Sequence, residues 1–264
     1  TVFTLDPQRR VLDNASVAVD GDRIVAVGDA AELRAHNAPR QTINAHRKAV
    51  LPGLIDSHAH AGHAMLRTLG TGGDAGAWMK AAAQVYTEAS DEHFWHAEAA
   101  LASLEKLKAG VTTGVSLLGG GDTIMRTDDV AYGSAHCEGV AEIGTRSVVA
   151  VGPTRPPHPR TYASWHDGKA SERPVTFEEQ FAVSRKLLDL WHGRGRLKIA
   201  LLTPVLRDEH QRGATVGGLL LQHVHDLRGG ARVEVAGGFV GQQQAGAVHQ
   251  RARNRHALQL SARE

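Results

Sequence analysis

The sequence has a single cysteine, almost no net charge and no long apolar run. Cys137 alone among 264 residues excludes an intrachain disulfide framework and fits a reducing compartment such as the cytoplasm. No apolar run approaches the roughly 18 residues of a membrane span. The net charge of +2 comes from scattered basic residues, without the basic stripe or aromatic platform that nucleic acid requires. We therefore expect a soluble globular protein of the cytoplasm with no nucleic-acid and no membrane partner.

The first fifty residues have the pattern of β structure. The opening "TVFTLDPQRR" has neither an initiator methionine nor a leader-like pattern, and we expect a few residues to precede Thr1. In "ASVAVDGDRIVAVGD", two apolar runs flank the glycine-centred turn Asp20-Gly21-Asp22, which predicts a hairpin. We expect residues 1–49 to form a small β unit.

From residue 50 onward, strand patterns alternate with helix patterns. The predicted strands are "VTTGVSLL", "RSVVAVGP" and "RLKIALLTP", and a proline-rich loop follows the second of them. The predicted helices cover 91–110, with Ser90 as N-cap, 129–144, and 177–193, with a capping box from Thr176 to Glu179. This alternation predicts an α/β fold with a parallel sheet.

The composition changes after about Arg207. From there on, arginine replaces lysine completely, glutamine becomes frequent and Phe239 is the only aromatic residue. One interpretation is a variable C-terminal region. The other is a departure from the parent reading frame, because such composition is typical of GC-rich DNA translated out of frame. We favour the second and expect residues 207–264 to be an atypical tail, out of frame or disordered.

The stretch "VLPGLIDSHAHAGHAML" places His58 and His60 one residue apart behind a strand. Residues at i and i+2 of a strand point to the same face, so two imidazoles there can share one metal ion. Such a pair alone is more often simply solvated. The context is more specific, because Pro52-Gly53 breaks the strand entry and Leu54-Ile55 has core character.

At this point a family resemblance becomes clear. "PGLIDSHAH" resembles the signature of the amidohydrolase superfamily, metal-dependent hydrolases built on a (β/α)8 barrel. "VAVDGDRIVAVGD" resembles the small β-sandwich of these enzymes, and "LKAGVTTGVSLL" resembles their second barrel strand. The resemblance covers about residues 1–204. It implies a partial TIM-type barrel of about four strand–helix units in residues 50–206, with a β-sandwich portion in residues 1–49.

The resemblance also implies a chemistry. His58 and His60 would bind one divalent metal ion, Zn²⁺ or Fe²⁺, at the C-terminal end of the first barrel strand. The ion would lower the pKa of its bound water to roughly 7, and the hydroxide would attack a ring carbon. The expected function is a hydrolase or deaminase acting on non-peptide C–N bonds of a cyclic amide, amidine or related small molecule.

A lysine at the end of the fourth strand marks the two-metal members of this family. Lys198 lies near the beginning of "RLKIALLTP" instead, which favours the one-metal branch of cytosine deaminase, guanine deaminase and the triazine hydrolases. Oligomers are common in this family, so self-association is expected by analogy.

The rest of the family's site cannot be placed. Histidines on the fifth and sixth strands, an aspartate on the eighth and a proton-transferring glutamate are all unassigned. His223 and His225 in "LLLQHVHDL" follow an apolar run and are substitute ligand candidates, although no helix of adequate length separates them from Pro204. The alternative hypothesis is therefore a catalytically incomplete fragment.

Three residues are candidates for the substrate pocket. His63 follows the histidine pair closely, and Asp122 and Arg126 lie in "LLGGGDTIMRTDD", the loop after the second strand. This glycine-rich loop lacks the lysine and helix start of a phosphate-binding loop, so pocket shaping is its expected role.

Overall fold

The computed structural model describes residues 1–69, 71–119, 126–166 and 169–202, so the predicted tail lies outside the described residues. The strands are β1 (Val2–Phe3), β2 (Val11–Leu12), β3 (Ala15–Asp20), β4 (Arg23–Asp29), β5 (Leu54–Asp56), β6 (Val111–Leu117), β7 (Arg146–Val151), β8 (Arg160–His166), β9 (Lys169–Val175) and β10 (Leu197–Leu201). The helices are α1 (Ala30–His36), α2 (Ala75–Gln84) with the π-helical turn η1 (Val85–Ala89), α3 (Glu92–Lys108), α4 (Val130–Ile143) and α5 (Phe177–Trp191).

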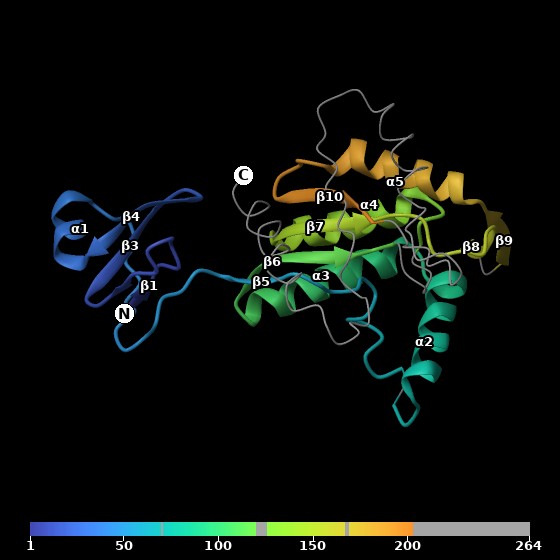
Figure 1. The fold of residues 1–264 in the computed structure, drawn as a ribbon, viewed down its shortest axis with the longest axis horizontal. Helices are drawn as coiled ribbons and strands as arrows, with labels where there is room; N and C mark the ends of the chain where they lie inside the picture. Colours follow the sequence, from blue (N-terminus) through green and yellow to red (C-terminus); the bar gives the residue numbers. More distant parts are fainter. Residues whose placement is uncertain (70, 120–125, 167–168, 203–264) are drawn as a thin grey trace, which may run out of the picture.

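Residues 1–36 form two small antiparallel sheets and one short helix (Figure 1). β1 pairs with β2, and β3 pairs with β4 across a turn in which Gly21 has φ +58°. A positive φ suits glycine, which has no Cβ to clash. The hairpin predicted around Asp20-Gly21-Asp22 is confirmed, whereas the β-sandwich portion stays a prediction.

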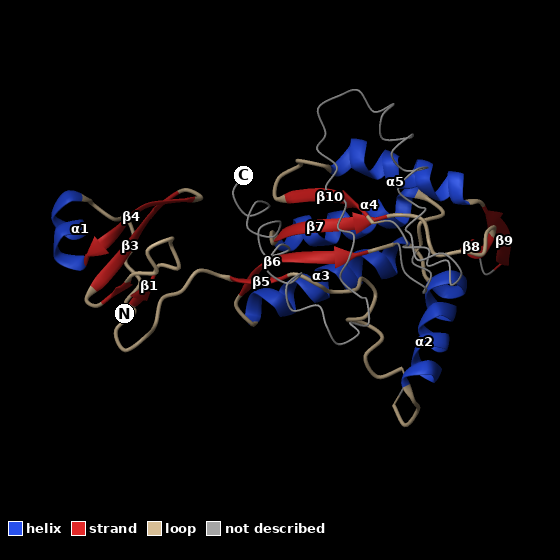
Figure 2. Ribbon diagram, viewed as in Figure 1, coloured by secondary structure: helices blue, strands red, loops and turns tan. Residues whose placement is uncertain are grey.

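The larger part of the structure is built on a four-stranded sheet in the order β10-β7-β6-β5 (Figure 2). All three neighbouring pairs are parallel. Each crossover between these strands contains a helix, as parallel pairing requires. The predicted α/β alternation with a parallel sheet is confirmed, and the closure of these strands into part of a barrel remains a prediction.

The helix ends show where local sequence sets the fold. The capping box of Thr176 and Glu179 at the start of α5 is present as predicted. The predicted N-cap of α3 is wrong: Asp91 accepts from the Phe94 N–H instead of Ser90. Ser90 Oγ is engaged elsewhere, because it donates to the Tyr86 carbonyl and accepts from Trp95 Nε1.

The core lies between the sheet and its helices, where Trp95, Leu118 and Val149 are fully buried. α3 and α4 approach closely at Gly139, where a Cβ would lie 2.3 Å from the His96 carbonyl oxygen. Since a backbone oxygen cannot move aside as a flexible side chain can, glycine is what lets these two helices pack.

Two expectations fail in this part of the fold. Leu54 and Ile55 are not core residues but are 59% and 68% exposed, because β5 is an edge strand of the described sheet. The proline-rich segment 152–168, expected to be a loop, contains β8, which pairs antiparallel with β9 just after it. β9 contains Pro174, which is tolerated because both strands of a two-stranded hairpin are edge strands.

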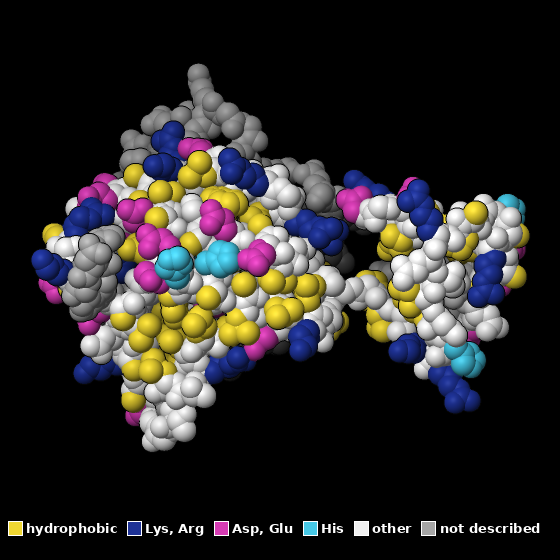
Figure 3. Space-filling view, turned by 180° about the vertical axis from the view of Figure 1, so that it is seen from behind, with side chains coloured by type: hydrophobic (Ala, Val, Ile, Leu, Met, Phe, Trp, Pro, Cys, Tyr) yellow, Lys and Arg dark blue, Asp and Glu magenta, His cyan; other side chains and the backbone are white. Residues whose placement is uncertain are grey.

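Apolar and charged side chains are separated on the surface. Seen from behind, apolar side chains gather on the larger body below a band of acidic, basic and histidine side chains (Figure 3). In the described part of the chain, none of the helices has the length and apolar character needed to cross a bilayer.

The helix contact at Gly139 gives a first prediction. We expect Gly139→Ala to lower the free energy of unfolding by about 1–3 kcal/mol, because the added methyl group forces α3 and α4 apart. Gly76→Ala, in the exposed first turn of α2, is the matched control and should be neutral or slightly stabilising. Urea denaturation of both variants measures the difference, and equal effects would contradict the close-packing argument.

Candidate metal site

His58 and His60 lie just beyond the end of β5, where main-chain pairing with β6 continues. The Leu117 N–H donates to the Ala59 carbonyl at 2.7 Å, and the Ala61 N–H donates to the Leu117 carbonyl at 3.0 Å. His60 itself forms an isolated parallel bridge with Leu117. The pair is therefore held at the C-terminal ends of two parallel strands, the edge at which α/β folds place their sites.

The two imidazole rings face each other through their Nε2 atoms. These atoms are 3.2 Å apart, and the rings meet edge to face with centroids 5.0 Å apart. Two nitrogens bound to one tetrahedral zinc at 2.0–2.1 Å are separated by about 3.3 Å. The spacing thus fits two ligands of one divalent ion.

The rings of His63, Trp78 and Tyr86 pack beside this pair, and we call them the aromatic wall. The His63 ring stacks on His60 with centroids 4.9 Å apart and meets the Trp78 ring edge to face at 4.7 Å. Gly62 has φ +85°, and a Cβ there would lie 2.4 Å from the Tyr86 ring. Glycine is thus needed for the chain to pass close to Tyr86 and turn His63 onto His60.

Burial favours the neutral form of His60 and His63. Burial lowers the pKa of His60, and the nearby His63 and His58 rings lower it further. Burial also lowers the pKa of His63, although the Glu98 carboxylate acts in the opposite direction. A neutral imidazole keeps the lone pair that a metal ion requires.

The ligand set is incomplete within the described ranges. No group of three or more histidine, cysteine, aspartate or glutamate side chains there is arranged to hold a metal ion. A catalytic zinc site usually has three protein ligands. Asp122, His223 and His225 lie outside the described residues.

Arg126, a candidate for substrate contact, lies in the interior of the described structure, and its contact with substrate stays a prediction. Its side chain is fully buried and forms a bidentate ion pair with Asp128, with both nitrogen–oxygen distances 2.9 Å. It also donates to the Ala163 carbonyl at 2.6 Å and to the Tyr132 hydroxyl at 2.8 Å. Because these partners come from α4 and β8, Arg126 joins the β8–β9 hairpin to the helix layer.

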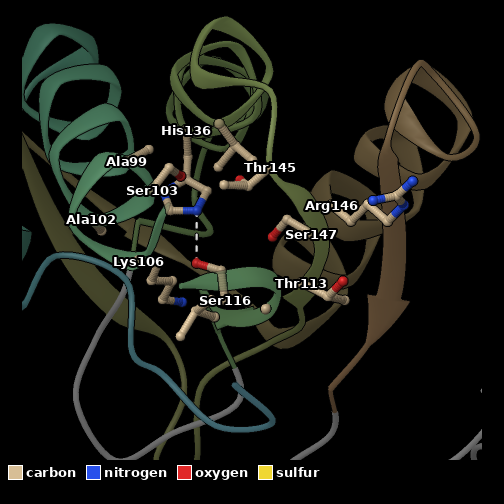
Figure 4. A pocket seen from close by; sticks show the side chains of 13 residues that line it. Ala99, Ala102, Ser103, Lys106, Thr113, Ser116, His136, Thr145, Arg146 and Ser147 are labelled. Carbon is tan, nitrogen blue, oxygen red and sulfur yellow. Dashed lines mark hydrogen bonds between the residues drawn. The ribbon is translucent and has the colours of Figure 1, made fainter. Parts of the chain in front are cut away.

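A separate pocket lies between the helices and the sheet and does not include the histidine pair (Figure 4). The empty space in and at the mouth of this pocket is about 320 Å³. Inside it, Ser116 Oγ and His136 Nε2 are 2.7 Å apart, and His136 Nδ1 is 3.4 Å from a Glu98 oxygen. Sequence reasoning missed this buried group, because its three residues lie on different elements and no spacing connects them.

Comparisons with known proteins find similarity to one domain family and to several deaminases. A bacterial imidazolonepropionase-like composite domain family matches residues 17–37, which span most of the β3–β4 hairpin and α1. A 5′-deoxyadenosine deaminase of Methanococcoides burtonii is 23% identical over 201 residues, 76% of this chain and 39% of that protein. A 5-methylthioadenosine/S-adenosylhomocysteine deaminase of Syntrophobacter fumaroxidans is 32% identical over 123 residues, 42% of this chain and 26% of that protein.

This chain is a relative of the amidohydrolase-superfamily deaminases. An adenosine deaminase from Xanthomonas campestris, solved with bound zinc, shares the fold with a TM-score of 0.53 and 21% identity. That likeness covers 76% of this chain and 40% of the other. The chain thus spans less than half the length of each of these deaminases.

The buried Arg126 gives a second prediction. We expect Arg126→Met to lower the free energy of unfolding by about 3–5 kcal/mol, because Asp128 would be left as an uncompensated buried charge. Arg185→Met, on the exposed side of α5, removes the same type of side chain where it forms no ion pair with the described residues, and it should change stability little. Thermal and urea denaturation measure both variants. A small effect at Arg126, similar to that at Arg185, would contradict the argument that Asp128 depends on this ion pair.

The pKa shifts give a third prediction, for the metal-free chain. We expect NMR titration of the ring protons to give midpoints for His60 and His63 below their ordinary value of 6.5. Since the unfolded chain then binds more protons, the free energy of unfolding should fall as the pH drops below about 6.5. Midpoints above 6.5 would contradict the neutral state inferred for these rings.

Proposed function

We propose that this chain carries part of the metal site of a hydrolase that acts on non-peptide C–N bonds in a small cyclic substrate. The observation that carries the proposal is the 3.2 Å spacing of His58 and His60 Nε2 at the C-terminal end of parallel strands. The names of the relatives, which are deaminases of adenosine-type compounds, support the same class of reaction.

The proposed roles follow from the positions of the side chains. His58 and His60 would hold one divalent ion, zinc or iron, and their Nε2 atoms would be its ligands. When bound, such an ion polarises the substrate and acidifies water enough to make it a nucleophile near neutral pH. The zinc in the Xanthomonas campestris deaminase favours zinc over iron.

The aromatic wall suggests what the substrate looks like. His63 belongs to a cluster of flat rings beside the histidine pair: it stacks on His60, lies parallel to Tyr86 and meets Trp78, whose Nε1 donates to the Leu66 carbonyl at 3.0 Å. A planar heterocycle would fit against such a ring better than an aliphatic chain. We propose that the substrate is a cyclic amide, an amidine or an amino-substituted ring. We also propose, by analogy with the family, that the protein acts in the cytosol and self-associates.

One observation favours a second candidate, a catalytically incomplete fragment. The histidine pair supplies two ligands, and the part of the chain that the structure describes contains no group of three. Two imidazoles alone would bind a metal ion loosely. The two candidates therefore differ in how tightly the chain holds zinc.

Metal content tests the proposal. We expect the purified 264-residue chain to retain about one zinc ion after dialysis against a mild chelator, measured by plasma mass spectrometry. His58→Ala and His60→Ala should each abolish the retained zinc. Complete loss of zinc from the unmodified chain would instead support the incomplete fragment.

His93→Ala is the matched control for this experiment. His93 is an exposed residue of α3, so its loss removes a histidine without touching the pair. Zinc content should stay unchanged in this variant. Undiminished zinc in both His58→Ala and His60→Ala would show that the site lies elsewhere.

A further inference from the structure

Asp56 links the helix layer to the histidine pair. Its two carboxylate oxygens have different partners: Oδ1 accepts from the His58 N–H at 3.2 Å, and Oδ2 lies 3.2 Å from Lys106 Nζ. One side chain thus contacts both the backbone of a proposed ligand and a cation on α3.

The contact between Asp56 and His58 ends the strand. A carboxylate that accepts from the N–H two residues later forms an Asx-turn, which takes the place of main-chain pairing. β5 ends at Asp56, and main-chain pairing with Leu117 resumes only at Ala59, so this contact holds the backbone of His58 in the gap between them. The position of the His58 ring therefore depends on the rotamer of Asp56.

Lys106 is the group that fixes this rotamer. Lys106 and Asp56 are 23% and 30% exposed, so their pairing is partly shielded from solvent. Among the described strands, β5 pairs only with β6. The ion pair adds a contact between β5 and α3, the helix that carries Lys106. A rotating carboxylate would leave the turn, and with it the His58 ring, less well defined.

The sequence makes room for this lysine at Gly114. Gly114 is the register partner of Asp56 on β6, and a Cβ there would lie 3.1 Å from Lys106 Nζ. The lysine stem also lies within 4 Å of this point. A side chain at position 114 would therefore press on Lys106 where it passes β6 to reach Asp56.

We propose that Lys106, acting through Asp56, is a positioning residue for the metal site, holding His58 in the orientation that binds the ion. This inference rests on the proposed function, because it assigns the support of the same histidine pair. Neighbouring charges do not compete for the role: Glu105 pairs with Arg67 at 2.7 Å, and Lys108 is exposed.

Zinc affinity of the full chain, measured by competition with a chelating dye, tests the proposal. We expect Lys106→Met to weaken zinc binding by about tenfold, in the range typical of residues that orient a ligand. Lys106→Arg should restore most of the affinity, because it keeps a cation near Asp56. Lys108→Met removes the same charge two residues away and should bind zinc as the unmodified chain does. Equal affinities for Lys106→Met and Lys108→Met would overturn the proposal.

A double-mutant cycle tests whether the effect passes through Asp56. We expect Lys106→Met to cause no further loss of zinc affinity once Asp56 is replaced by alanine. Additive losses would overturn the proposed route. Gly114→Ala keeps every charge but presses on Lys106, and it should weaken zinc binding even if Lys106→Met folds poorly.

The metal-free chain separates this inference from the proposed function. The His58 amide resonance should shift in Lys106→Met and stay in place in Lys108→Met, whether or not zinc binds. An unmodified chain without zinc affinity would overturn the proposed function, whereas an unmoved His58 amide would overturn the role of Lys106.

Discussion

Main-chain pairing between residues 59–61 and Leu117 is the constraint on which the candidate site depends. β5 has only three residues, and both histidines lie beyond its last residue. Without the hydrogen bonds from Leu117 to Ala59 and from Ala61 to Leu117, they would lie on an unsupported loop. These bonds resume the parallel pairing of β5 and β6 with a shift of one residue, from Asp56 opposite Gly114 to His60 opposite Leu117, and the Nε2 atoms of the pair lie 3.2 Å apart.

Some buried polar side chains have hydrogen-bond partners and others have none among the described residues. Arg126 and Asp128 complete each other's hydrogen bonds, which is the condition under which a buried ion pair is tolerated. Glu98 lies near Tyr86, His63 and His136, and its oxygens make no hydrogen bond within the described chain. A buried carboxylate without hydrogen bonds costs free energy. Tyr86 Oη and His136 Nδ1, close to Glu98, are likewise buried without a hydrogen-bond partner in the described chain, and so are His158 Nδ1, Arg160 Nε and Gln180 Nε2 elsewhere.

Local sequence was sufficient where short-range chemistry decides the structure. The capping box at Thr176, the turn at Gly21 and the strand–helix alternation each depend on residues that are close in the chain. The prediction of Ser90 as N-cap was wrong because a competing partner, Trp95, engages its hydroxyl only once the helix is packed. Leu54 and Ile55 were expected in the core from their apolar character, but an edge strand exposes them.

For the candidate site too, some features follow from the sequence and others only from the tertiary structure. By itself, the sequence determined that His58 and His60 lie one residue apart behind a strand, and that the chain resembles metal-dependent hydrolases. Only the tertiary structure decided that Leu117 aligns the pair, that His63 stacks on it, and that Lys106 reaches Asp56 across Gly114. These partners lie up to about sixty residues from the pair, and no spacing rule connects them. Sequence periodicity reports which face of an element a residue occupies, whereas contacts between elements are set by how the sheet and its helices pack.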